Sequence, residues 1–100
     1  MTVAVIGTIR FPAENVAHVL PHMKALVDAT NAHDGCLAYD VGQDPFDPGL
    51  FRFSELWPDQ ASLTAHLTAP HIQPWREVGQ KYGVSDRRFQ VFDVTNARSL

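Results

Sequence analysis

The sequence lacks the features that mark membrane, secreted and nucleic-acid-binding proteins. No apolar run approaches the ~20 residues of a membrane-spanning helix, and no basic residue precedes the apolar segment 1–11, as a signal peptide would require. Cys36 is the only cysteine, which excludes an internal disulfide and a cysteine-rich metal site. The 8 basic residues are outnumbered by 11 acidic ones, so no positive surface for nucleic acid is expected. We therefore expect a cytoplasmic protein without a nucleic-acid or membrane partner.

Motifs that bind common cofactors are also missing. The chain has no GxGxxG, P-loop, HExxH, GxSxG or CxxC pattern, which removes the usual sequence support for dinucleotides, ATP and structural zinc. His18 and His22 have the four-residue spacing of a helical metal chelate, but they lie away from the apolar stripe and lack a third ligand. We expect neither a metal nor a bound cofactor.

The remaining composition indicates one globular domain. The chain has 100 residues, 45% of them apolar, which suits a single domain spanning 1–100 with a modest core. Hydrophobic periodicity predicts strands at 2–11, 36–43, 50–57 and 87–95, a helix after Pro12 and a second helix after Trp57 that is interrupted at Pro70. This order predicts an α+β fold, ferredoxin-like βαββαβ, with a four-stranded antiparallel sheet and helices on one face.

The first helix contains a proline. Its apolar stripe recurs at steps of three and four residues and includes Val19, Leu20 and Met23. Pro21 removes the hydrogen bond to the carbonyl of Ala17, so the sequence predicts a kink or a break there.

The strands 36–43 and 50–57 are predicted to form a hairpin around the turn-rich segment between them. With the turn centred between Phe46 and Asp47, Ala38 would face Glu55 across the hairpin. A register error of one residue would exchange the two faces.

Both faces of the strand 50–57 carry large apolar side chains. One side is aromatic, and the other holds Leu50 and Leu56, with Tyr39 beside them in the expected register. Helices can cover only one face, and a large apolar patch is unusual on a monomer. The sequence therefore predicts a homodimer through the second face, with Tyr39 at its interface.

Two polar residues lie among apolar neighbours. Glu55 lies between Phe53 and Trp57 on the aromatic side of its strand, where lost hydration would raise the pKa of its carboxyl; pairing with a cation or a helix end is the alternative. His66 shares a helical face with Leu63, so it should point at the sheet and could accept a proton from a substrate hydroxyl. A structural hydrogen bond is the alternative for His66.

Several segments carry a family resemblance. They are Asp-Gly-Cys-Leu-Ala-Tyr at 34–39, the turn 44–49, Ser-Glu-Leu-Trp-Pro-Asp at 54–59, then His66 and Pro70-His71. With the element order, they resemble the antibiotic biosynthesis monooxygenase family over about the whole chain. The resemblance implies a dimeric α+β barrel, in which two sheets pack face to face and each subunit has a cavity between its sheet and helices.

The resemblance also implies a reaction. The leading hypothesis is a cofactor-independent monooxygenase that uses dioxygen to oxidise a small aromatic phenol, quinol or polyketide-like substrate. The catalytic candidates are His66 as base, Glu55 as its partner, and Trp57; the substrate-binding candidates are Phe51, Phe53, His71 and Trp75. His71 alternatively caps the helix break.

Other members of the family point to alternatives. Polyketide-oxidising members have an Asn in the active cavity where this chain has Phe53. The active-site residues of haem-degrading members are not matched either, because His66 lies at about the position of their Trp. The alternatives are a non-catalytic small-molecule binding or regulatory dimer, a haem-degrading relative, or an isomerase, for which Arg52 and Arg76 are the nearest cations.

Overall fold

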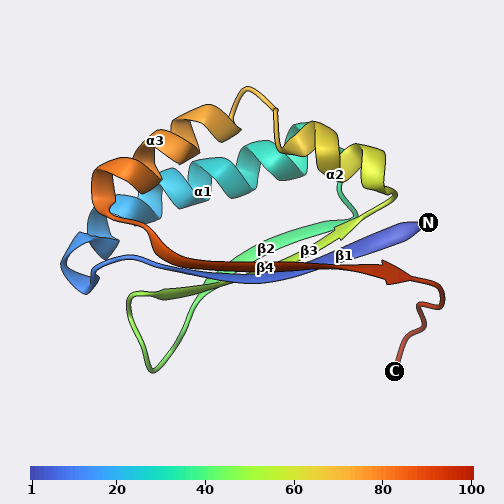
Figure 1. Cartoon of the computed structure of the whole chain (residues 1–100), viewed down its shortest axis with the longest axis horizontal. Helices are drawn as coiled ribbons and strands as arrows, with labels where there is room; N and C mark the ends of the chain where they lie inside the picture. The colour runs from blue at the N-terminus through green and yellow to red at the C-terminus, as the bar shows by residue number, and fades with distance from the viewer.

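The computed structural model describes residues 1–100 and has two layers, a sheet and a layer of helices on one face of it (Figure 1). The elements are β1 (Thr2–Arg10), the 3₁₀ turn η1 (Ala13–Asn15), α1 (Val16–His33), β2 (Ala38–Gln43), β3 (Leu50–Trp57), α2 (Gln60–His66), α3 (Ile72–Tyr82) and β4 (Ser85–Val94). This is the α+β, ferredoxin-like arrangement that the element order predicted. None of the helices is both long enough and apolar enough to span a bilayer.

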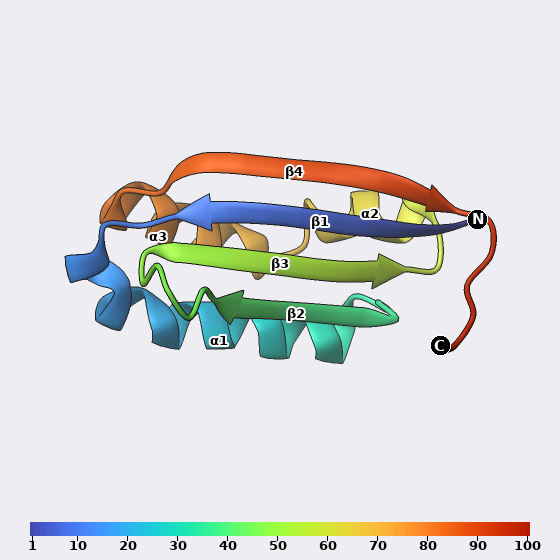
Figure 2. The same cartoon turned by 90° about the horizontal axis from the view of Figure 1, so that it is seen from below.

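The sheet has the strand order β2-β3-β1-β4, with every neighbouring pair antiparallel (Figure 2). β1 is an interior strand, because it pairs with β3 on one side and β4 on the other. Its residues alternate, and Val3, Val5 and Ile9 point into the core beneath the helices.

α1 is one helix from Val16 to His33, so the predicted break at Pro21 is wrong. Pro21 and Ala17 both lie on the exposed side of α1, where water can bind the carbonyl that lacks an intrahelical partner. Leu20, predicted within the buried stripe, is 41% exposed because it lies at the edge of the stripe that Val19 and Met23 form.

The hairpin register differs from the prediction by one residue. Tyr39, not Ala38, pairs with Glu55, and Gln43 pairs with Phe51. The difference arises in the turn, where the carboxylate of Asp44 accepts hydrogen bonds from the backbone N–H groups of Phe46 and Asp47. This Asx-type turn moves the centre of the hairpin by half a residue.

The corrected register moves Tyr39 to the helix side of the sheet. It is 3% exposed, and its ring packs edge-on against Phe53 and Trp57. The prediction that Tyr39 belongs to an outer interface is therefore wrong. The uncovered face takes its apolar character from other residues, among them Ile6 (61% exposed) and Phe92 (45% exposed).

Candidate functional site

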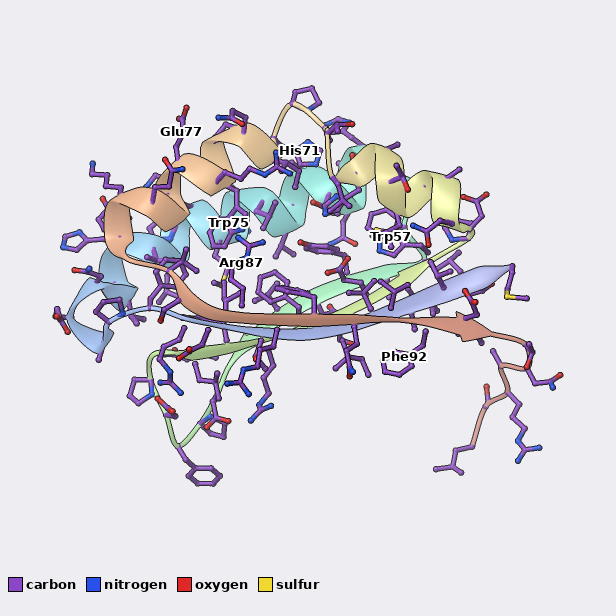
Figure 3. The ribbon with its side chains drawn as sticks, in the orientation of Figure 1. Trp57, His71, Trp75, Glu77, Arg87 and Phe92 are labelled. Carbon is purple, nitrogen blue, oxygen red and sulfur yellow. The ribbon has the colours of Figure 1, made fainter.

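A cavity of about 260 Å³ lies between the sheet and the helices α2 and α3. Most of its walls are apolar or aromatic, and the polar groups in it are few. Among the lining residues are Phe53 from β3, Trp75 from α3, and Phe89 from β4. Trp75 and Arg87 are seen in the space between α3 and the sheet in Figure 3. The volume is close to the lower end of ligand pockets, ~300 Å³.

His66, the last residue of α2, lines this cavity and is 4% exposed. Two aromatic rings hold its imidazole, with centroid distances of 4.8 Å to Trp57 and 5.2 Å to Tyr39. α2 reaches this position because Asp59 caps its N-terminus by accepting a hydrogen bond from the Ser62 backbone. The sheet and the cap together fix the direction in which the imidazole points.

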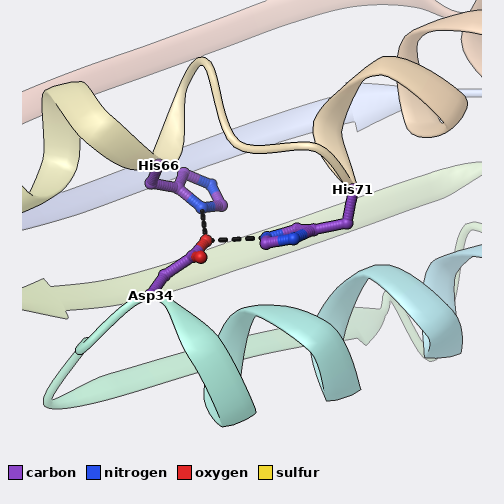
Figure 4. Close-up of side chains that lie close together, drawn as sticks. All are labelled: Asp34, His66 and His71. Carbon is purple, nitrogen blue, oxygen red and sulfur yellow. Dashed lines mark hydrogen bonds and ion pairs between the residues drawn. The ribbon is translucent and has the colours of Figure 1, made fainter.

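Asp34 is the hydrogen-bond partner of His66 (Figure 4). The Nδ1 of His66 lies 2.6 Å from Oδ2 of Asp34, and a carboxylate oxygen accepts, so Nδ1 carries the proton. The other ring nitrogen, Nε2, has no partner in the chain. Thr30 Oγ1 is the only fully buried side-chain polar atom that lacks a hydrogen bond. The Nε2 of His66 also lacks one, so this nitrogen is not fully buried. The neutral imidazole therefore offers a free lone pair.

Burial and Asp34 act on the pKa of His66 in opposite directions. Burial lowers the pKa because the charged imidazolium loses hydration, whereas the hydrogen bond to Asp34 raises it, and burial is the larger effect. The pKa lies below its usual value of 6.5, so the imidazole is mainly neutral at pH 7.

His71 meets the same oxygen of Asp34. Its Nε2 lies 2.7 Å from Asp34 Oδ2, and its side chain is 17% exposed. His71 is the residue that precedes α3, and it does not line the cavity. Asp34 thus joins the end of α2 and the beginning of α3 to the end of α1.

Glu55 lies on the sheet wall of the cavity and is 7% exposed. Its Oε1 accepts a hydrogen bond of 3.0 Å from the indole N–H of Trp57. Burial raises the pKa of Glu55, and the Trp57 hydrogen bond offsets part of that rise. The partner of His66 is therefore Asp34, while Glu55 pairs with Trp57.

The structure separates the predicted site residues into two groups. His66, Glu55, Phe53 and Trp75 line the cavity. The other three do not: Trp57 and Phe51 are fully buried behind the wall, and His71 lies beyond Asp34. Trp57 still contributes by holding Glu55 and packing on His66.

The sequence did not single out Asp34 or Arg87 as site residues, and it indicated Arg76 only as a cation for the isomerase alternative. The only sequence signal for Asp34 is its place in the 34–39 segment that carries the family resemblance. Arg76 and Arg87 line the cavity and have no acidic partner. Arg87 shares the helix side of β4 with Val91, which pairs with Val5 of β1, and this pairing could not be read from β4 alone.

Solved structures share this fold over almost their whole length. A Deinococcus radiodurans protein, provisionally described as an antibiotic biosynthesis monooxygenase, is 28% identical with a TM-score of 0.89, covering 98% of this chain and 97% of its own. A second structure, described as antibiotic biosynthesis monooxygenase, is 32% identical with a TM-score of 0.85, covering 94% and 99%. Among curated proteins, the uncharacterised protein sll1783 of Synechocystis is 17% identical over 98 residues, which is 98% of this chain and 67% of that protein.

The sequence pattern of a known family also fits the chain directly. The family described as Antibiotic biosynthesis monooxygenase matches residues 2–78, a span that includes β1, the hairpin, Asp34, His66 and the cavity wall of α3. The chain belongs to the antibiotic biosynthesis monooxygenase family.

Proposed function

We propose that this protein is a monooxygenase that oxidises a small phenol or quinol with dioxygen, as a homodimer in the cytoplasm and without a resident metal or flavin. One observation carries the proposal: His66 lines an aromatic cavity, a carboxylate holds its Nδ1, and its Nε2 has no partner. Family membership supports the reaction type. The free Cys36 is compatible with a reducing compartment.

The cavity supports a substrate with one or two rings. An apolar cavity of ~150 Å³ takes up benzene, and the cavity here is about 260 Å³, which suits a naphthalene-sized molecule better than a polyketide of three or four rings. Phe53, Trp75 and Phe89 offer ring faces and edges for contact with an aromatic substrate.

The charged residues of the cavity suit a substrate anion. His66 Nε2 is the base that removes the hydroxyl proton. Arg76 and Arg87 are the cationic residues that line the cavity, and no carboxylate neutralises them. They would stabilise a phenolate and the peroxide that follows it.

The proposed reaction needs no external reductant. With 1-naphthol, His66 takes the hydroxyl proton and the naphtholate passes one electron to dioxygen. The resulting pair combines, forming a C–O bond at the ring carbon para to the oxygen, and the peroxide takes the proton back from His66. The O–O bond then breaks as the ring hydrogen leaves, giving 1,4-naphthoquinone and water. The substrate supplies all four electrons that reduce dioxygen.

The test is oxygen uptake with 1-naphthol, using metal-free protein and ¹⁸O-labelled dioxygen. We expect uptake above the buffer rate and one labelled oxygen in the quinone. His66→Ala should lower kcat/KM by about 10²–10⁴, the usual contribution of a general base. His33→Ala, at the exposed end of α1, is the matched control and should keep the wild-type rate.

Two results would contradict the proposal. Uptake no faster than in buffer with 1-naphthol and with a naphthohydroquinone would show that the cavity is a binding site only. Full activity in His66→Ala would show that another group removes the proton.

A further inference from the structure

Three side chains that commonly bind metals converge where α1 ends and α2 passes into α3. Asp34 follows α1, His66 ends α2 and His71 precedes α3. Their ligand atoms, Oδ2 of Asp34, Nδ1 of His66 and Nε2 of His71, all lie within 4.8 Å of one another (Figure 4). The three come from separate segments, so the tertiary fold brings them together.

The chemistry of this set suits a divalent transition metal. Two imidazole nitrogens with one carboxylate oxygen are typical ligands for Zn²⁺, which catalytic sites often hold with three side chains and a water. Both histidines already point at one oxygen, at 2.6 and 2.7 Å. Tetrahedral zinc ligands lie about 3.3 Å apart, so side-chain shifts on the order of 1 Å would place all three around one ion.

Charge and access also favour a cation. The only partners of Asp34 are the two histidines, and no Lys or Arg neutralises its carboxylate. The side chains of His66 and Asp34 are 4% and 8% exposed, whereas that of His71 is 17% exposed. His71 also borders a second hollow of about 250 Å³ between α1 and α3. An ion could therefore enter from the His71 side, without passing through the substrate cavity.

We propose that Asp34, His66 and His71 bind Zn²⁺, and that bound zinc switches off the base. A metal on Nδ1 forces the imidazole proton onto Nε2, the nitrogen that is proposed to take the substrate proton, so His66 can no longer accept a proton. The binding site stands on the geometry of the three ligands alone. The switch rests on the proposed function, because it needs His66 as the base.

The binding test uses Co²⁺, whose visible absorption reports tetrahedral coordination. Metal-free protein titrated with Co²⁺ should develop this absorption with one ion per chain. Asp34→Asn and His71→Gln should each weaken binding by at least about 100-fold, since even outer partners of a metal site cost 10–100-fold. The double variant His18→Gln, His22→Gln, which removes the exposed histidine pair of α1, should bind as the wild type does. Circular dichroism checks that each variant is folded.

The activity test follows 1-naphthol oxidation during zinc titration. Zinc should abolish oxygen uptake by the wild type, EDTA should restore it, and whatever activity His71→Gln retains should not respond to zinc at the same concentration. No Co²⁺ signal, or an equal signal in Asp34→Asn, overturns the site. A Co²⁺ signal with zinc-insensitive oxidation overturns the switch. A Co²⁺ signal in a metal-free protein that never oxidises naphthol supports the site and removes the function on which the switch rests.

Discussion

At the scale of single residues, Asp34 decides which nitrogen of His66 can react. Its carboxylate oxygen lies 2.6 Å from Nδ1, which keeps the proton on Nδ1 and leaves Nε2 as the acceptor. Asp34 is therefore a positioning residue: it acts on the substrate only through the tautomer and orientation of the imidazole.

Asp34→Asn should lower kcat for 1-naphthol by about 100-fold or more, because an amide can also donate and so favours the wrong tautomer. KM should change by less than about 3-fold, since the cavity walls remain. Steady-state kinetics measure the split, and ¹⁵N NMR of His66 should show the proton leaving Nδ1. A rise in KM with unchanged kcat would mean that Asp34 only shapes the cavity.

Glu55→Gln tests the buried carboxyl on the sheet. Burial raises the pKa of Glu55 above 4.5, so the folded state holds this proton more tightly than the unfolded chain does. Its contribution to stability is then full below pH 4.5 and is lost as the pH rises through the folded-state pKa. The substituted amide has no such proton but can still accept the Trp57 hydrogen bond.

We therefore expect the free energy of unfolding of Glu55→Gln, measured relative to that of the wild type, to rise as the pH increases from 4.5 through the folded-state pKa of Glu55. Urea denaturation at a series of pH values measures this difference. Taking the difference between the two proteins cancels the titration of His66, whose lowered pKa acts in the opposite direction. A difference that is constant with pH would show that Glu55 is not perturbed.

At the scale of elements, a glycine in β1 shapes the cavity. Gly7 pairs with Phe53 on β3 and with Phe89 on β4. The ring of Phe89 lies where a Cβ of residue 7 would be, and it reaches Phe53 at a centroid distance of 5.3 Å. The missing side chain thus lets two strands that are not neighbours share an aromatic contact.

Gly7→Ala should force the Phe89 ring away from β1 and open this wall. We expect a loss of about 1–3 kcal/mol in stability, the usual cost of overpacking, and weaker binding of 1-naphthol. Thermal unfolding and fluorescence titration measure the two effects. Gly42→Ala in β2, where nothing lies within 4 Å of the added carbon, is the matched control. Wild-type affinity in Gly7→Ala would show that Phe89 is not part of the binding wall.

At the scale of the whole molecule, the helices leave one face of the sheet uncovered. Ile6 and Phe92 are more than two-fifths exposed on this face, and Phe92 points away from the helices (Figure 3). Apolar side chains of this size, on adjacent strands, are typical of a surface that packs against a second copy. A homodimer through this face is thus still our prediction, though with Ile6 and Phe92 in the place of Tyr39.

Sedimentation should give twice the chain mass of 11.1 kDa at micromolar concentration. Ile6→Lys should shift the equilibrium to the monomer, because it buries a charge without a partner. Leu20→Lys, on the exposed side of α1 and 41% exposed, removes an apolar residue from the helix layer, away from the face, and should leave the mass unchanged. A monomeric wild type would contradict the predicted interface.

The sequence by itself determined the order of the elements, the fold class and the inward direction of His66 and Glu55. These follow from local periodicity, since the 3.6-residue repeat of a helix and the two-residue repeat of a strand need no knowledge of distant parts of the chain. The hairpin register was decided by the Asp44 turn, whose side-chain hydrogen bonds the pattern does not reveal. The partner of His66 was decided by the tertiary structure alone, because Asp34 lies 32 residues away and meets it only when the ends of α1 and α2 pack together.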